Sequence, residues 1–230
     1  MKVPHSGHKV CYNIPVNKEY RELKRRGSMK YDIEIHKPFT DGNVIDYGII
    51  KGNNNILFIK AGQDGSFYGY KNKYLKIAKS INERYGSTVI CSSNPFDGKN
   101  PLDNAMEVIE SYCRENGFGG YEIYYMGHSN GGLIGAWYGT KYPQIKRMLL
   151  VNAPLVFGYD KTKEGLLRFD KEQCVLIYGS LDESYPYSIL ISTIRNEKVK
   201  CRIIKGQDHH FSKDTYDFKN LPADFLYKII

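Results

Sequence analysis

From Met29 onward, the chain alternates between short apolar runs bounded by Gly, Asn and Pro and longer amphipathic stretches. Short apolar or alternating runs predict β-strands, and apolar residues at helical spacing predict α-helices. Strands interleaved with helices are typical of βαβ units, whose strands lie parallel in one sheet. The sequence therefore predicts an α/β fold, with no repeat or linker that divides it.

The predicted sheet has eight strands, of which only the first two carry polar alternation. These two are joined by a loop with Thr-Asp-Gly-Asn at 40–43, so we expect an antiparallel hairpin at the sheet edge. The later runs are continuously apolar, as parallel strands buried on both faces are. The strands are predicted at 30–36, 44–50, 56–61, 88–92, 122–126, 146–152, 174–178 and 199–204, and the helices at 71–84, 101–116, 131–141, 184–196 and near 221–230.

Length and composition are those of one domain. A chain of 230 residues with 41% hydrophobic residues can bury one sizeable core, which we place at 29–230. No apolar run approaches the roughly 20 residues of a membrane span, and the first residues lack the apolar region of a secretory signal. We therefore expect a cytoplasmic protein of undetermined oligomeric state. The cysteines form no Cys-x-x-Cys pair and are predicted to be reduced thiols: Cys11, Cys91, Cys113, Cys174 and Cys201.

The formal charge of +8 is concentrated at the amino terminus. Residues 1 to 30 hold eight Lys or Arg against two Glu, which accounts for +6 of the total. A basic flank of this kind is more often a solvated arm than a binding device. We therefore predict that residues 1–28 form a basic arm of unassigned structure, and we do not expect nucleic acid as the partner.

The motif with the most chemical content is Gly-His-Ser-Asn-Gly at 127–131, centred on Ser129. An apolar run precedes it and a helical stretch follows, which is the context that a Gly-x-Ser-x-Gly turn requires. The turn lifts the serine off the strand end, and the small Gly127 and Gly131 let strand and helix approach. Ser129 then lies at a helix amino terminus, where negative charge is stabilised. The motif predicts a nucleophilic serine.

A serine hydroxyl needs a base to take its proton and an acid to orient that base. Asp182 lies in the loop just after the buried run 174–178, and His209 and His210 lie in the loop after the run 199–204. Taken singly, Asp182 could cap a helix, and either histidine could be a surface residue. The order serine, aspartate, histidine, each at a strand end, favours a single site instead.

These motifs resemble those of the α/β-hydrolase superfamily over most of the chain from about Met29. The residues that carry the resemblance are Gly-His-Ser-Asn-Gly-Gly at 127–132, Gly-Ser-Leu-Asp-Glu-Ser-Tyr-Pro at 179–186 and Gly-Gln-Asp-His-His-Phe at 206–211. The resemblance implies a mostly parallel eight-stranded sheet flanked by helices, with Ser129 on the nucleophile elbow. It also implies a catalytic triad of Ser129, Asp182 and His209, with His210 as the second choice of base.

The same resemblance implies an oxyanion hole formed by the backbone N–H groups of Gln63 and Asn130. The sequence has Ala61 where the family often has histidine, which leaves the support of that loop unexplained but does not remove the donor. Substrate-pocket candidates lie beside these groups and in the loop after the fourth strand: Gly62, His128, Asn94 and Pro95. Trp137 is assigned to core packing.

Only about 20 residues separate the strands at 146–152 and 174–178, which leaves room for at most one short helix and little or no cap domain. An open pocket suits an esterase or thioesterase, so we predict hydrolysis of a small-molecule carboxylic ester or thioester through an acyl-enzyme. The chemistry requires no metal and no cofactor. An aminopeptidase or lipase with the same triad, or a non-catalytic hydrolase-like binding protein, are the alternatives.

Overall fold

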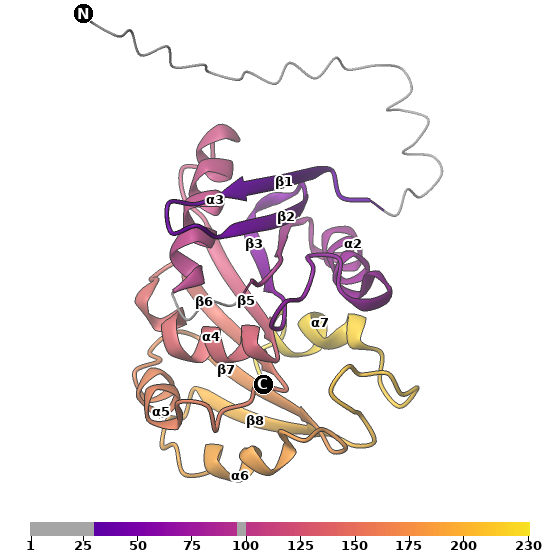
Figure 1. Ribbon diagram of the computed structural model, residues 1–230, viewed down its shortest axis with the longest axis vertical. Helices are drawn as coiled ribbons and strands as arrows, with labels where there is room; N and C mark the ends of the chain where they lie inside the picture. Colours follow the sequence, from indigo (N-terminus) through magenta and orange to yellow (C-terminus); the bar gives the residue numbers. More distant parts are fainter. Residues whose placement is uncertain (1–29, 96–99) are drawn as a thin grey trace, which may run out of the picture. The chain divides into compact units, whose positions relative to one another are not determined.

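The computed structural model describes residues 30–95 and 100–230 (Figure 1). The predicted basic arm, 1–28, lies outside the described residues. One sheet of eight strands runs through the described part: β1 (Ile33–Pro38), β2 (Val44–Ile50), β3 (Asn53–Lys60), β4 (Ser87–Ser92), β5 (Glu122–His128), β6 (Ile145–Val151), β7 (Gln173–Gly179) and β8 (Val199–Ile204).

The strand order across the sheet is β1-β2-β4-β3-β5-β6-β7-β8. β2 runs antiparallel to both of its neighbours, β1 and β4. All other neighbours pair in parallel. The predicted edge hairpin and the mostly parallel eight-stranded sheet are therefore confirmed. The parallel strands bring their carboxyl ends, and the loops that follow them, to one edge of the sheet.

Helices cover both faces of the sheet (Figure 1). They are α2 (Lys73–Tyr85), α3 (Pro101–Glu115), α4 (Asn130–Tyr138), α5 (Tyr159–Leu167), α6 (Ser188–Ile191) and α7 (Leu221–Phe225). The segment between β6 and β7 holds only α5, so no large cap is present among the described residues.

Two helices, α6 and α7, are shorter in the structure than the sequence predicts. The helix predicted at 184–196 is a single α-helical turn, α6, after a 3-10 turn at Tyr185–Tyr187. The hydroxyls of Ser192 and Thr193 bind the carbonyl groups three residues earlier, and the backbone N–H groups there do the same. Such local bonds compete with the α-helical pattern and convert the segment into tighter turns.

The last helix ends early because a side chain from the sheet takes the backbone acceptors that follow it. Nε2 of Gln173, at the start of β7, donates to the carbonyl groups of Phe225 at 3.1 Å and Lys228 at 2.7 Å. These bonds hold the carboxyl-terminal segment on the sheet without further helix.

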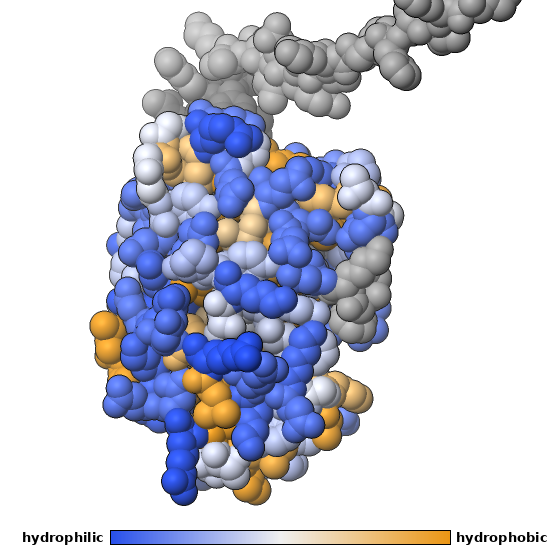
Figure 2. All heavy atoms as spheres, turned by 90° about the vertical axis from the view of Figure 1, so that its left-hand side faces the viewer, coloured by the Kyte–Doolittle hydropathy of each residue, from blue (hydrophilic) through white to orange (hydrophobic). Residues whose placement is uncertain are grey.

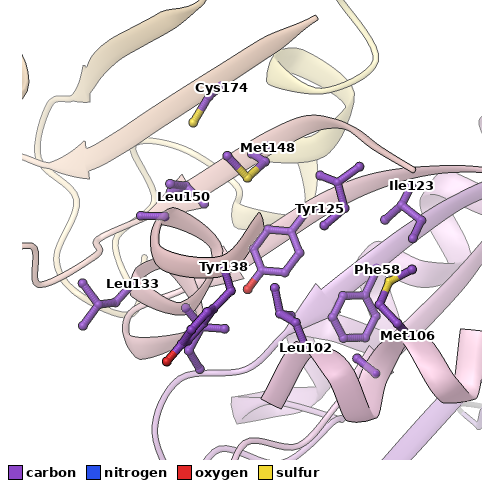
Figure 3. Packing of buried hydrophobic residues seen from close by; sticks show 14 of the residues in the cluster. Phe58, Leu102, Met106, Ile123, Tyr125, Leu133, Tyr138, Met148, Leu150 and Cys174 are labelled. Carbon is purple, nitrogen blue, oxygen red and sulfur yellow. The ribbon is translucent and has the colours of Figure 1, made fainter. Parts of the chain in front are cut away.

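The core consists of two apolar clusters, one on each face. Alternate residues of β3 point in opposite directions: Phe58 joins the cluster under α3, α4 and α5, and Ile59 joins the cluster under α2 and α7. Figure 3 shows the first cluster, in which Phe58 and Tyr125 from neighbouring strands face Leu102 of α3. The Tyr125 hydroxyl also donates to the carbonyl of Gly131 at 2.5 Å. This bond fastens the start of α4 to the middle of the sheet.

The surface shown in Figure 2 is mostly hydrophilic, with apolar side chains in small separate groups. Among the described residues, no helix combines the length and the apolar character needed to cross a membrane.

Candidate active site

Ser129 lies in the turn between β5 and α4, as predicted, and has φ 56° and ψ −122°. A positive φ at a residue other than glycine is strained by roughly 1–3 kcal/mol, so the surrounding structure must impose it. The amide of Ser129 donates to the carbonyl of Val151 at 2.8 Å, and its own carbonyl accepts from Gly132 at 2.9 Å. The turn is therefore fixed to β6 on one side and to α4 on the other.

The glycines beside Ser129 are required by close backbone approach. A Cβ added to Gly127 would lie 2.3 Å from the carbonyl oxygen of Gly131, and one added to Gly131 would lie 2.4 Å from that of Lys60. Both distances are far inside van der Waals contact, and the obstructing atoms are backbone. Only glycine at these two positions lets β3, β5 and α4 meet beneath the serine.

His209 and Asp182 form a hydrogen-bonded pair in the same region. Nδ1 of His209 lies 2.5 Å from Oδ2 of Asp182, whose side chain is fully buried, while the histidine side chain is 36% exposed. The other carboxylate oxygen accepts from the amide of Ser184 at 2.6 Å. A histidine that donates through Nδ1 keeps Nε2 as an acceptor, which is the tautomer that a general base needs.

His210 has different contacts. Its backbone amide donates to Oδ1 of Asp208 at 3.1 Å, and its ring makes no hydrogen bond with Asp182 within the described part of the chain. Burial lowers the pKa of His210, with the neighbouring His209 as a further cause. Of the two candidate bases, His209 is the one held by the buried carboxylate.

Ser129 Oγ and His209 are not hydrogen-bonded to each other in the described structure, although both line one cavity. Hydrogen bonds between nucleophile and base are often long in a free enzyme and close only when substrate binds. The arrangement therefore supplies an oriented base in the lining of the cavity that Ser129 also lines.

Two side chains hold the backbone of His209 in place, a role that the sequence did not predict for either of them. Nδ2 of Asn152, directly after β6, donates to the carbonyl of His209 at 3.0 Å, and its Oδ1 accepts from the amide of Gly179 at 2.9 Å. Nε2 of His128 donates to the same His209 carbonyl at 2.8 Å. Burial lowers the pKa of His128 well below its usual value, so this ring is neutral and structural. The sequence feature that could have identified Asn152 is its position as a polar residue at the end of an apolar predicted strand.

Asn94 joins the two loops that carry the predicted oxyanion donors. Its buried side-chain amide donates to the carbonyl of Ala61 at 3.0 Å and to Oδ1 of Asn130 at 2.9 Å. Its backbone carbonyl accepts from Asp64 at 2.9 Å. This side chain therefore supports the loop in which the sequence has Ala61. Among the described residues, the amides of Gln63 and Asn130 donate to no other group.

A cavity of about 950 Å³ opens above these loops. Ser129, Asp182, His209, Gln63 and Asn130 all line it. Its apolar wall is formed by six side chains: Leu133, Trp137, Pro154, Phe157, Leu181 and Tyr187.

The four pocket candidates do not line this cavity: Gly62, His128, Asn94 and Pro95. Asn94 and His128 are buried, and their side chains are hydrogen-bonded to the neighbouring loops rather than turned to the cavity. Trp137, assigned to core packing, does pack against the first apolar cluster, and it also lines the cavity. Its Nε1 donates to the hydroxyl of Thr162 at 2.9 Å.

Lys60, at the end of β3, is a fully buried lysine beneath the Gln63 loop, and its Nζ donates to the carbonyl of Ser93 at 2.8 Å. Burial lowers its pKa to about 7, whereas an unfolded lysine titrates near pH 10.4. Between these values the unfolded chain binds a proton that the folded chain lacks, so the free energy of unfolding rises with pH.

We therefore expect the difference in unfolding free energy, wild type minus Lys60→Met, to rise by up to about 1.4 kcal/mol per pH unit between pH 7 and 10. Methionine is unbranched and only one atom shorter, so it fills most of the space of the lysine side chain without the charge. Urea denaturation of both proteins at pH 7, 8 and 9 measures the difference. A difference that does not change with pH would contradict the assignment.

No group of three or more His, Cys, Asp or Glu side chains among the described residues is placed to hold a metal ion. Cys91, Cys113, Cys174 and Cys201 are free thiols. Burial raises the pKa of Cys91 to about 12, which makes it a poor nucleophile.

No protein-family model matches the sequence, and no curated protein matches it. Solved structures do match, and they show that this architecture is the α/β-hydrolase fold. Est1E from Butyrivibrio proteoclasticus has a TM-score of 0.66 at 15% identity, with 84% of this chain and 97% of that chain covered. The thioesterase domain from the curacin biosynthetic pathway has a TM-score of 0.61 at 12% identity, with 85% and 99% covered.

A peptidase is also similar. Pyrococcus horikoshii acylaminoacyl peptidase has a TM-score of 0.62 at 15% identity, and the match covers 89% of this chain but 42% of that one. Esterases, a thioesterase and a peptidase thus share the fold of this chain, and all three are hydrolases.

Proposed function

We propose that this protein is a serine hydrolase that cleaves a carboxylic ester or thioester. The observation that carries the proposal is the hydrogen bond from His209 to the buried Asp182, in the cavity that Ser129 also lines. A buried carboxylate that orients a partly exposed histidine beside a strained serine is the arrangement that activates a hydroxyl nucleophile. The α/β-hydrolase fold of the chain supports the same reaction class.

In the proposed mechanism, Ser129 Oγ attacks the acyl carbonyl while Nε2 of His209 takes its proton. The amides of Gln63 and Asn130 bind the oxyanion, and Asp182 stabilises the imidazolium through Nδ1–H. Collapse of the tetrahedral intermediate expels the alcohol or thiol, which receives the proton from His209. Water, activated by the same histidine, then cleaves the acyl-enzyme and frees Ser129.

The cavity wall favours an apolar or aromatic acyl group. Leu133 and Trp137 of α4 and Phe157 before α5 present apolar surface to the same space as Ser129, and each buried CH₂ contributes about 0.8 kcal/mol. Est1E, a structural neighbour, has been solved with ferulic acid bound, which is an aromatic acid. Two additional CH₂ groups of the acyl chain, buried against this wall, should therefore raise kcat/KM by roughly tenfold.

The test is a set of 4-nitrophenyl esters together with labelling of the wild type by a fluorophosphonate. We expect covalent labelling, and a kcat/KM for the butanoate roughly tenfold above that for the acetate. Absence of both labelling and hydrolysis would refute the proposal. A wild type that labels but cleaves only aminoacyl amides or long-chain glycerides would reassign the substrate to the aminopeptidase or lipase alternative.

A further inference from the structure

A second cavity, of about 410 Å³, lies beside the first and is strongly basic. Lys71 lines it from the 3-10 turn before α2, Lys73 and Lys76 line it from the start of α2, and Lys213 and Lys219 line it from the segment before α7. Two aspartates, Asp214 and Asp217, also line it, so the lining has a formal excess of three positive charges. A third aspartate, Asp208, lies 4.0 Å from Lys213 and reduces the local excess to two. The mechanism proposed above does not use this cavity.

The positive charges in this cavity are poorly compensated. Lys219 lies 3.4 Å from Asp217, and Lys213 lies 4.0 Å from Asp208, which are weak, partly exposed contacts. Lys71, Lys73 and Lys76 have no carboxylate within ion-pair distance among the described residues. Like charges gathered around one hollow repel each other, and an anion would relieve that repulsion.

Of the five lysines, Lys73 has the surroundings that most favour binding of an anion. Its Nζ lies 4.4 Å from the centre of the Phe218 ring, which packs against one side of the ammonium. Burial lowers the pKa of Lys73 to about 8, and the charge of Asp208 opposes that effect. The aromatic ring limits hydration, so the ammonium lacks part of its water shell, and Asp208 acts on it only from beyond ion-pair distance among the described residues. The first turn of α2 also contains no acidic residue, although the helix dipole favours negative charge there.

The basic cavity adjoins the candidate active site through one residue. His210 lines both cavities, and it follows His209 directly in the chain. The His210 side chain therefore lies between a ligand bound at Lys73 and the cavity that the acyl group would occupy.

We propose that the basic cavity binds a phosphate group, and that this phosphate belongs to the alcohol or thiol part of the substrate whose acyl group reacts at Ser129. Phosphate carries close to two negative charges and three acceptor oxygens at neutral pH, which suits a cavity lined by lysines from two segments. The assignment of the phosphate to the substrate rests on the proposed hydrolase function. The binding of phosphate does not.

The binding arm of the test uses calorimetric titration of pyrophosphate into the full chain. The variant is Lys71→Gln/Lys73→Gln, and the control is Lys163→Gln, an exposed lysine of α5 that lines neither cavity. We expect the double variant to lose about tenfold or more in affinity, and the control to bind like the wild type. Affinity should also fall as pH rises above about 8 and Lys73 loses its proton. Equal affinity in all three proteins would overturn the phosphate site.

The kinetic arm compares 4-(2-hydroxyethyl)phenyl butanoate with its phosphate monoester, which differ only in the phosphate. We expect a KM about tenfold lower for the phosphate ester in the wild type, and equal values in Lys71→Gln/Lys73→Gln. Lysine-dependent pyrophosphate binding with equal KM values would overturn the assignment to the substrate and identify a free phosphate ligand. Lysine-dependent binding without hydrolysis of either ester would refute the proposed function while supporting the phosphate site.

Discussion

Ser129→Ala is expected to lower kcat for ester hydrolysis by roughly 10⁴- to 10⁶-fold and to abolish fluorophosphonate labelling. The reason is that Ser129 is the proposed nucleophile, and the variant keeps His209 but has no hydroxyl at position 129 for it to deprotonate. Alanine also removes only one oxygen, so the strained backbone and the contacts to Val151 remain possible. Steady-state hydrolysis of 4-nitrophenyl butanoate and gel detection of the label measure both effects.

The matched control for this substitution is Ser184→Ala, because Ser184 lines the same cavity. It should keep the label and nearly the wild-type kcat. Circular dichroism and the urea midpoint should be the same for both variants and the wild type. Persistence of activity in Ser129→Ala, with the fold intact, would remove Ser129 from the mechanism.

Asp182→Asn is expected to lower kcat by about 10⁴-fold with little change in KM. The asparagine is nearly isosteric, but it can donate a hydrogen bond to Nδ1 of His209, which places the remaining proton on Nε2. A histidine in that tautomer cannot accept the proton of Ser129. The loss of negative charge also removes the group that stabilises the imidazolium. Because KM reflects the cavity wall rather than the buried acid, the effect should appear in kcat.

Glu183→Gln provides the control for charge, since Glu183 is the next residue and lines the same cavity. We expect its kcat to stay within a few-fold of the wild type, because its carboxylate has no contact with His209 in the described structure. If both substitutions lowered kcat equally, general electrostatics rather than orientation of His209 would be responsible. Single-turnover kinetics at several pH values separates proton transfer from binding.

The glycine positions illustrate how much of the site is readable from the sequence. Gly127 and Gly131 are predictable because a Gly-x-Ser-x-Gly motif between a strand and a helix has few other backbone solutions. The positions of Asp182 and His209 at strand ends are predictable for a related reason: parallel strands carry the loops that follow them to one sheet edge. The helices were less predictable, since Ser192 and Thr193 form local hydrogen bonds that end α6 early.

What could not be read from the sequence depends on contacts between distant segments. Sequence order gives no reason why Asn94 should join the loops of Ala61 and Asn130, rather than line the pocket. Trp137 has helical spacing compatible with either a core or a cavity position. The direction in which a side chain leaves a crowded strand end is set by the residues packed around it.

The sequence by itself determined the parallel sheet, the sharp turn at Ser129 and the chain order of the candidate acid and base. These features depend on hydrophobic periodicity and on local backbone sterics, which act over a few neighbouring residues. The resemblance to known hydrolases ranked His209 ahead of His210, but only the tertiary structure brought His209 within hydrogen-bond distance of Asp182 and gathered lysines from two segments around the basic cavity. Hydrogen bonds and charge clusters of this kind arise between residues far apart in the chain, so they exist only once the sheet and its loops have assembled.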